Sequence, residues 1–248
     1  MARREQLKSD LVRYREHTPP PHLAGWVECL WTGEAGRPTF AAPVRPDGCI
    51  DLVYSRREGL RAVGAMTVTQ RFDQAPDNFH CGVRFLPGMA GPFLGMPAGE
   101  LTDLAAPLNS SNCRPIDDAE TAAGAVRILA ASLPHPPSSQ TPIQRAIGAL
   151  TRAKGLARLD RTASQANLST RHFRRLCIGE SGLTPKQLCR ILRFRNALEI
   201  SRCAAPDWSA IALAAGYFDQ AHLIRDFREF AGETPMAVFS NRSAGAVA

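Results

Sequence analysis

Residues 216–235 of this 248-residue chain, GYFDQAHLIRDFREFAGETP, carry the most informative pattern in the sequence. This stretch carries a glycine, a short polar opening, an apolar stripe mixed with arginines, and a glycine and a proline at its end. Leu223 and Phe227 are four residues apart, so they lie on one face of a helix. Three polar side chains can project outward from the same helix: Gln220, His222 and Arg225. The pattern predicts a helix over 219–230 whose apolar stripe holds a domain together and whose polar face is free to contact something else.

The residues before this helix complete a helix-turn-helix pattern. Residues 208–214, WSAIALA, predict a short apolar helix, and Gly216 predicts the turn that follows it. In such a unit the first helix supports the second, which presents its side chains to the major groove of DNA. The large aromatic side chains Trp208 and Phe218 are expected in the core.

The same arrangement occurs earlier, in LDRTASQANLSTRHFRRLC, residues 159–177. This stretch divides into a short helix, a turn and a second helix over about 169–178, for which Ser169 is a natural N-cap. Phe173 and Leu176 face inward at helical spacing. Three arginines cluster toward the other side: Arg171, Arg174 and Arg175. A longer helix over 186–203 is predicted to join the two units.

Positive charge is concentrated in the helical part of the chain. Residues 1–140 hold 14 Lys and Arg against 15 Asp and Glu, whereas residues 141–248 hold 16 against 8. This asymmetry predicts a polyanionic partner for one half only. Nucleic acid is the leading candidate, because neutralising phosphates releases condensed counterions. A membrane surface is the rival and would need one strongly amphipathic basic helix.

A proline-rich stretch, LPHPPSSQTP at 133–142, coincides with the change in charge. It predicts an extended linker, because proline lacks the N–H donor and restricts the residue before it. We therefore expect a regulatory domain at 1–133, a linker at 134–142 and a DNA-binding domain at 143–241. No apolar run approaches the roughly 18 residues that span a membrane, and the N-terminus is polar, so a cytoplasmic protein is expected.

The N-terminal half reads as β-rich. Residues 44–55, VRPDGCIDLVYS, predict a turn running into a strand, and residues 61–72 and 80–91 predict further short strands. Glycine and proline at this density suit a small barrel or sandwich. Residues 115–133 predict a helix, with Asp117 and Asp118 near its N-terminus.

Residues from about 145 to 240 resemble the DNA-binding domain of the AraC/XylS family of bacterial transcription regulators. The family pattern is close to IAxxxGFxxxSxFxRxFKxxxGxTPxxYR. In the second unit it is matched by Ile211, Ala212, Gly216, Tyr217, Leu223, Arg225, Phe227, Gly232, Thr234 and Pro235. In the first unit it is matched by Leu168, Ser169, Phe173, Arg174, Arg175, Gly182, Leu183, Thr184 and Pro185. The departures include Cys177 for phenylalanine and Ala221 for serine.

The resemblance extends to the first half through residues 46–52, 82–88 and 97–103, which are similar to motifs in the sensor domains of some AraC-like regulators. Those domains are generally cupin-like β-structures that hold an effector or mediate dimerisation. The implied fold class is α+β, with a β-rich, cupin-like regulatory domain before an all-α double helix-turn-helix domain.

The resemblance implies a sequence-specific transcription regulator whose two recognition helices read successive segments of the major groove. Arginine suits guanine and glutamine suits adenine, while other residues hold phosphates. The candidate DNA-binding residues are Arg171, Arg174, Arg175, Gln220, His222 and Arg225. Two of them have a structural alternative, since Arg175 could tie helices together and His222 could cap its helix.

The partner implied is double-stranded DNA at a promoter or operator, with RNA polymerase, a small-molecule effector and a second copy of the chain as further candidates. No cofactor, metal or catalytic motif is expected, so the chain is not interpreted as an enzyme. The alternatives are a first half that only dimerises, one that responds to redox state or metal through Cys49, His80 and Cys81, and one that transfers alkyl groups. Asp47, Asp51, Arg84 and Glu100 either line an effector pocket or are turn and surface residues.

The seven cysteines are scattered and form no CxxC motif. Buried free thiols are therefore expected.

Overall fold

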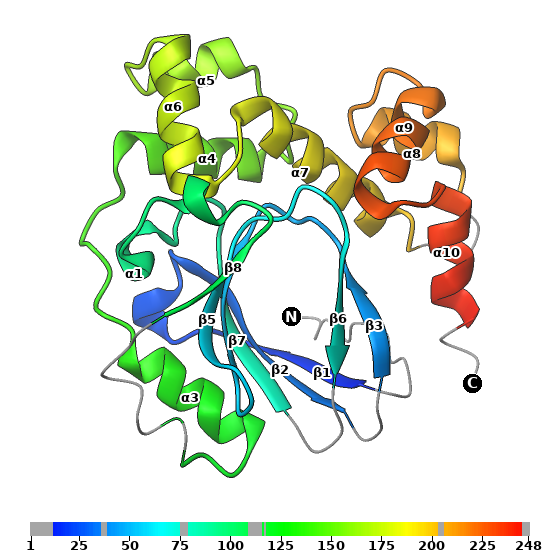
Figure 1. Ribbon diagram of the computed structural model, residues 1–248. Helices are drawn as coiled ribbons and strands as arrows, with labels where there is room; N and C mark the ends of the chain where they lie inside the picture. Colours follow the sequence, from blue (N-terminus) through cyan, green and yellow to red (C-terminus); the bar gives the residue numbers. More distant parts are fainter. Residues whose placement is uncertain are drawn as a thin grey trace.

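The computed structural model describes residues 12–35, 39–74, 79–108, 116, 118–202 and 206–244. A β-rich half precedes a helical half (Figure 1), which confirms the α+β class. No helix within these ranges is long and apolar enough to cross a membrane.

The larger sheet is antiparallel, with strand order β1-β2-β7-β4-β5-β8. Its strands are β1 (Val12–His17), β2 (Val27–Ala35), β7 (Phe79–Phe85), β4 (Ile50–Ser55), β5 (Gly59–Val63) and β8 (Ala105–Pro107). In β7, Val83 lies opposite Leu30 on one side and Leu52 on the other. Gly82 is required beside it, because a Cβ at this position would lie 2.6 Å from the indole of Trp31.

A smaller sheet pairs β3 (Thr39–Val44) with β6 (Gln70–Gln74). The predicted strand over 61–72 is wrong in its middle, since β5 ends at Val63 and β6 begins only at Gln70. Strand β5 ends just before Gly64, where a Cβ would lie 1.8 Å from the carbonyl oxygen of Leu101. The described part of this half also includes the short helices η1 (Pro21–Leu23), α1 (Gly91–Leu94) and η2 (Ala98–Leu101) and the longer α3 (Ala122–Ser132).

Helix α3 packs on β7 and β2, and it starts later than the sequence predicts. The hydroxyl of Thr121 accepts the N–H of Gly124 at 3.1 Å and so caps the helix at this point. Asp118 lies in a turn before the cap and not in the first helical turn, while Asp117 is outside the described residues.

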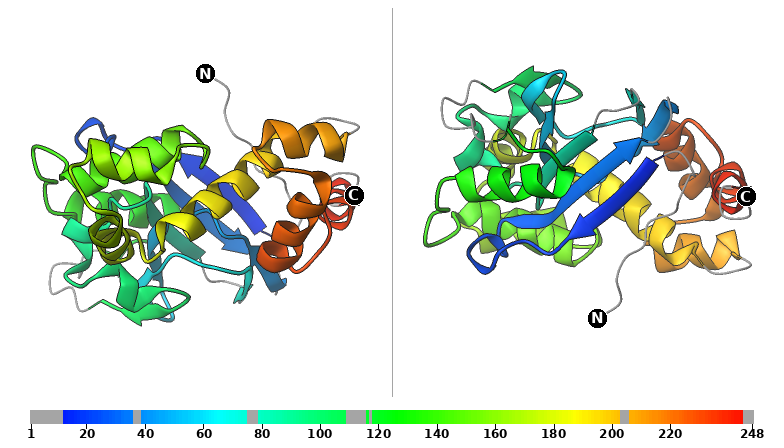
Figure 2. Two further views of the ribbon diagram at one scale, coloured as in Figure 1. Left: turned by 90° about the horizontal axis from the view of Figure 1, so that it is seen from above. Right: turned by 90° about the horizontal axis from the view of Figure 1, so that it is seen from below.

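Seven helices follow: α4 (Pro142–Arg152), α5 (Leu159–Gln165), α6 (Thr170–Ser181), α7 (Pro185–Ile200), α8 (Trp208–Ala214), α9 (Gln220–Ala231) and α10 (Pro235–Ala244). Helix α7 runs between the α5–α6 pair and the α8–α9 pair (Figure 2), as the sequence predicts for the joining helix. It begins with a reciprocal cap, in which the Thr184 hydroxyl accepts the N–H of Gln187 and the Gln187 side chain accepts the N–H of Thr184.

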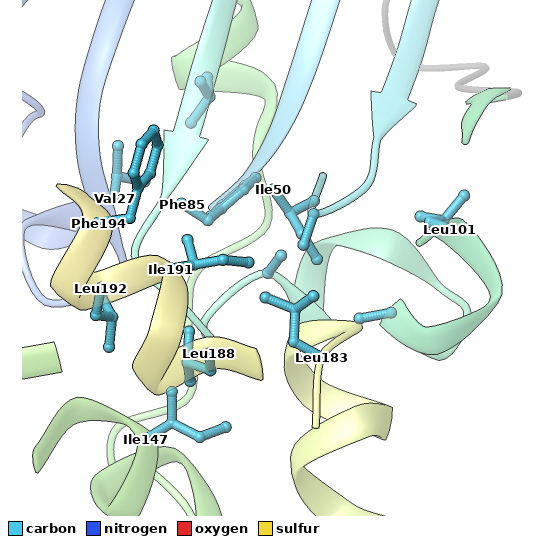
Figure 3. Packing of buried hydrophobic residues seen from close by; sticks show 14 of the residues in the cluster. Val27, Ile50, Phe85, Leu101, Ile147, Leu183, Leu188, Ile191, Leu192 and Phe194 are labelled. Atoms are coloured by element: carbon cyan, nitrogen blue, oxygen red, sulfur yellow. The ribbon is translucent and has the colours of Figure 1, made fainter. Parts of the chain in front are cut away.

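The two halves share one hydrophobic core. Figure 3 shows side chains of both halves meeting there: Val27, Ile50, Phe85 and Leu101 from the first, and Ile147, Leu183, Leu188, Ile191, Leu192 and Phe194 from the second. Gly48 and Gly88 bring the β-rich half close to the helices, since a Cβ on them would lie 3.0 Å from Leu188 and 2.7 Å from Ile147. The helical half is therefore held against the β-rich half by apolar packing.

An ion pair crosses the same boundary between β2 and α7. The guanidinium of Arg195 pairs with both carboxylate oxygens of Glu28, and the Cys49 thiol donates to Glu28 Oε2 at 3.2 Å. Burial raises the pKa of Glu28, but the charge and hydrogen bonds of Arg195 outweigh it and leave that pKa below its ordinary value.

We expect the Arg195→Met variant to be less stable than wild type by about 1–2 kcal/mol at neutral pH, because Glu28 then keeps its charge without the cation that pairs with it. In the wild type the lowered pKa of Glu28 stabilises the fold above the unfolded-state pKa, and this contribution is lost as the pH falls through the lower folded-state pKa. Urea denaturation at neutral pH and below about pH 4 measures the difference between the two proteins, which should narrow in acid. If the difference in stability between the two proteins were the same at both pH values, the loss in Arg195→Met would not come from its pair with Glu28.

Candidate nucleic-acid interface

The α5–α6 and α8–α9 pairs are built on the same hydrogen bonds. The N–H of Leu168 donates to the carbonyl of Ala163 at 3.0 Å, and the N–H of Tyr217 donates to that of Ala212 at 2.9 Å. These bonds close the turn after the first helix of each pair. The chain therefore contains two helix-turn-helix units, as the sequence predicts.

Each turn passes through one residue in the left-handed region and ends on a side-chain cap. Asn167, with φ 55°, serves the first unit, and Gly216, with φ 81°, serves the second. The Ser169 hydroxyl then accepts the backbone N–H three residues on at 3.3 Å, and the Asp219 carboxylate does the same at 2.6 Å. Both second helices thus start at a defined residue.

The second helix of the first unit, α6, buries an apolar side and exposes a basic one. Phe173 and Cys177 are buried, so the predicted Phe173 is confirmed as core. Arg171, Arg174 and Arg175 are all exposed, as predicted. An open hollow of about 470 Å³ runs along this face, lined by Ser169, Arg171, His172, Arg174, Arg175 and Ile178. This concave basic surface is suited to an anionic ligand.

The corresponding helix of the second unit, α9, also divides into two faces. Leu223 and Phe227 are fully buried, which confirms the predicted stripe. Gln220 and Arg225 are exposed, and Gln220 Oε1 accepts the hydroxyl of Ser209 on α8 at 3.1 Å. His222 is half-buried, with its ring edge-to-face on Tyr217 at 5.2 Å between centroids. The structure therefore divides the six candidate residues into two groups of three, one on each helix.

Counting from the two caps places the units in register. Arg175 and Arg225 are each six residues after their cap, and His172 and His222 are each three residues after it. His172 is exposed in the basic hollow, yet the sequence interpretation did not select it. Aligning the two units on their caps is the signal that finds it.

The second turn is one residue longer than the first, and the extra residue is Phe218. It lies between Tyr217, which is buried, and the Asp219 cap. The expectation that Phe218 belongs to the core is wrong: it is 87% exposed, because Tyr217 already fills the core position. Trp208, by contrast, is buried as expected.

Helix α9 is fixed to α7 by an arginine between two carboxylates. Arg190 Nη2 is 2.7 Å from Asp226 Oδ1 and 2.5 Å from Glu229 Oε2. The same guanidinium lies 4.9 Å from the ring centroid of Phe230. The Asp226 side chain is only 1% exposed. Arg190 is thus the main compensation for the buried carboxylate on α9.

The β-rich half holds the C-terminal ends of both α6 and α9. The hydroxyl of Thr102 donates to the carbonyl of Gly182, where α6 ends, at 2.7 Å. The N–H and the hydroxyl of Thr69 both donate to the carbonyl of Phe230, in the last turn of α9, at 2.8 Å. Carbonyls at a helix C-terminus lack intrahelical partners, so these contacts satisfy them.

The two contacts are joined to each other inside the β-rich half. Asp103, next to Thr102, accepts the N–H and the hydroxyl of Thr67, both at 2.6 Å. Gln70 donates to the carbonyl of the same aspartate at 3.2 Å. The loop that carries Thr69 is therefore braced by the segment that holds α6.

Three of the four polar candidates in the β-rich half come together. Arg84 Nε is 3.5 Å from Asp47 and 3.3 Å from Asp51, whose Oδ1 also accepts the Trp31 indole N–H at 2.7 Å. Burial raises the pKa of Asp51, against the effect of Arg84. Glu100 lies exposed on η2 and takes no part in this cluster.

The cysteines that the structure describes are buried free thiols, as expected: Cys29, Cys49, Cys81, Cys177 and Cys189. Burial raises the pKa of Cys81 to about 12 and that of Cys49 well above its ordinary value. A redox switch needs an accessible thiolate, so burial disfavours that alternative. Within the described ranges no group of three or more His, Cys, Asp or Glu side chains is placed to hold a metal ion. Cys113 and Cys203 lie outside the described residues.

Two family models match the chain. Residues 15–107, which span β1 to β8, match a domain of unknown function (DUF6597), and residues 162–241, which span the two units, match a helix-turn-helix domain. No protein with a curated description matches the chain.

Several solved structures resemble it at low identity. A DNA-binding transcriptional dual regulator from Escherichia coli K-12 is 19% identical, with a TM-score of 0.37 over 44% of this chain and 97% of that chain. The DNA-binding domain of AdpA, in complex with a target DNA, is 20% identical, with a TM-score of 0.40 over 42% and 96%. ToxT from Vibrio cholerae O395 is 8% identical, with a TM-score of 0.45 over 93% and 98%.

All three scores are below 0.5, so the helix-turn-helix family model, together with the two units, assigns the domain. Residues 162–241 are a helix-turn-helix domain, in the part of the chain where the resemblance to the AraC/XylS family predicts one, and this domain follows a β-rich domain of unknown function.

Proposed function

We propose that the chain is a sequence-specific regulator in which α6 and α9 read successive segments of the major groove on one face of the DNA. The supporting observation is the repetition of one unit: the same turn bond, a side-chain cap, and an exposed polar face on each second helix. Successive segments lie one helical turn apart, roughly 34 Å. A single chain could then read an asymmetric site.

In this proposal the DNA site consists of two segments, here called boxes, and each box is contacted by three of the six predicted residues. Arg171, Arg174 and Arg175 face the first box, and Gln220, His222 and Arg225 face the second. Some of these side chains contact base edges and the others hold phosphates. The domain limits that fit the proposal are a regulatory domain at 1–133, a linker at 134–142 and a DNA-binding domain at 143–241.

The regulatory half would act by fixing the distance and angle between the two recognition helices. Thr102 holds the end of α6, Thr69 holds the end of α9, and Asp103 joins the two contacts. An effector or a second copy of the chain regulates only if it favours one arrangement of these contacts over another. Promoter DNA, RNA polymerase, an effector and a second copy are the partners that this function requires or admits.

Selection of random duplex DNA by the full-length protein, repeated across salt concentrations, tests the proposal. We expect one motif with two boxes about one turn apart, and a salt slope that reports the phosphates neutralised. Binding that yields no motif and disappears in salt would contradict sequence-specific reading by the free protein.

A further inference from the structure

The exposed Phe218 is left without a role by the packing of the domain. It is 87% exposed, whereas its neighbour Tyr217 is 3% exposed and closes the turn. The first unit makes the same turn without an equivalent residue, since Leu168 is followed directly by the Ser169 cap. Neither the core nor the turn therefore requires an aromatic side chain at this position.

The place of Phe218 is where a helix-turn-helix meets DNA. It immediately precedes Asp219, the cap of α9, and the residues at the N-terminal end of a recognition helix contact base edges. The adjoining face carries Gln220 and Arg225, both exposed, and Ala221, which is exposed and small. A large apolar side chain at the leading edge of a polar and basic face has one apolar counterpart in the major groove, the C5-methyl group of thymine.

We propose that Phe218 is a specificity-determining residue that packs against a thymine methyl group in the box read by α9. This inference rests on the proposed function, because it requires α9 to lie in the major groove. It adds a kind of readout that the arginines and the glutamine cannot supply. Polar side chains recognise the hydrogen-bonding groups of a base edge, whereas an apolar ring distinguishes thymine by its methyl group.

Replacement of thymine by uracil removes this methyl group and leaves the pairing edge unchanged. The experiment measures binding of the full-length protein to its selected duplex by fluorescence anisotropy, with each thymine of the second box replaced in turn by uracil. For wild type we expect one replacement to weaken binding about fourfold, which corresponds to one methyl group removed from water. Phe218→Ala should bind the thymine duplex about tenfold more weakly and should no longer distinguish it from the uracil duplex.

Leu213→Ala is the matched control. Leu213 is 69% exposed on α8, the supporting helix of the same unit, so this variant also removes an exposed apolar side chain. It should keep the wild-type preference for thymine. Thermal melting of both variants checks that the domain is folded, and we expect melting temperatures close to wild type because neither side chain is in the core.

The outcomes separate the inference from the proposed function. A thymine preference that persists in Phe218→Ala, or no thymine preference in wild type, overturns the role of Phe218 while sequence-specific binding stands. If Phe218→Ala binds every duplex as wild type does but loses self-association, Phe218 is a protein contact and the inference is also overturned. Failure to select any motif overturns the proposed function, and the inference falls with it.

Discussion

Arg190→Met is expected to lower the free energy of unfolding by about 3–5 kcal/mol, which is the usual loss when one partner of a buried ion pair is removed. The Asp226 side chain is 1% exposed, and Arg190 supplies the hydrogen bonds to its Oδ1. Methionine keeps much of the apolar stem of the arginine but cannot compensate the buried carboxylate. Urea denaturation of the variant and wild type measures the loss directly.

Two further variants show whether the unpaired charge causes this loss. In Arg190→Met with Asp226→Leu no uncompensated carboxylate remains in the buried position, so most of the stability should return. Arg202→Met removes an exposed arginine just after α7 and should change stability by no more than about 0.5 kcal/mol. If Arg190→Met were as stable as Arg202→Met, α9 would not depend on the contact with Arg190.

The second large effect is expected in DNA binding. Arg171→Ala and Arg225→Ala should each weaken the preference for particular bases, in a different box for each variant. A bidentate arginine–guanine contact discriminates between bases by about 1–3 kcal/mol, so each variant should lose roughly 5- to 150-fold in specific affinity. The two residues are on separate helices, α6 and α9, so the affected base pairs should not overlap. Repeating the selection of random duplex DNA with each variant identifies the box in which the protein no longer prefers particular bases.

Arg127→Ala is the control for this pair, because Arg127 is an exposed arginine on α3 in the regulatory half. This variant should keep the wild-type base preferences in both boxes and the wild-type affinity for the selected duplex. A variant that weakens all sequences equally, with a salt slope smaller by about one, would assign its arginine to a phosphate. Loss of preference in the same box for both Arg171→Ala and Arg225→Ala would contradict the assignment of one helix to each box.

The helical half could be predicted closely because its signals are local. Ser169 caps α6 through a residue three positions away, and Phe173, Leu223 and Phe227 follow the helical period. Phe218 shows the limit of such reasoning. Its aromatic character predicts burial, but the core position of the turn is occupied by Tyr217, and only the comparison of the two turns identifies Phe218 as an addition.

The β-rich half and the contacts between the halves could not be predicted in the same detail. Strand pairing joins distant residues, such as Leu30 with Val83, and has no local signature. The break in the predicted strand over 61–72 depends on Leu101 lying against Gly64. The hydrogen bond from Thr69 to Phe230 joins residues 161 positions apart, so no local sequence pattern around either residue predicts it.

We predict that one rigid chain reads two boxes at a fixed spacing, and binding to a series of duplexes with different spacer lengths tests this prediction. The full-length protein is titrated with duplexes in which base pairs are inserted between the two selected boxes. Insertion of about five base pairs turns one box to the opposite face of the DNA, so affinity should fall by about tenfold or more. If affinity stayed the same at every spacing, α6 and α9 would not read the DNA together as parts of one rigid chain.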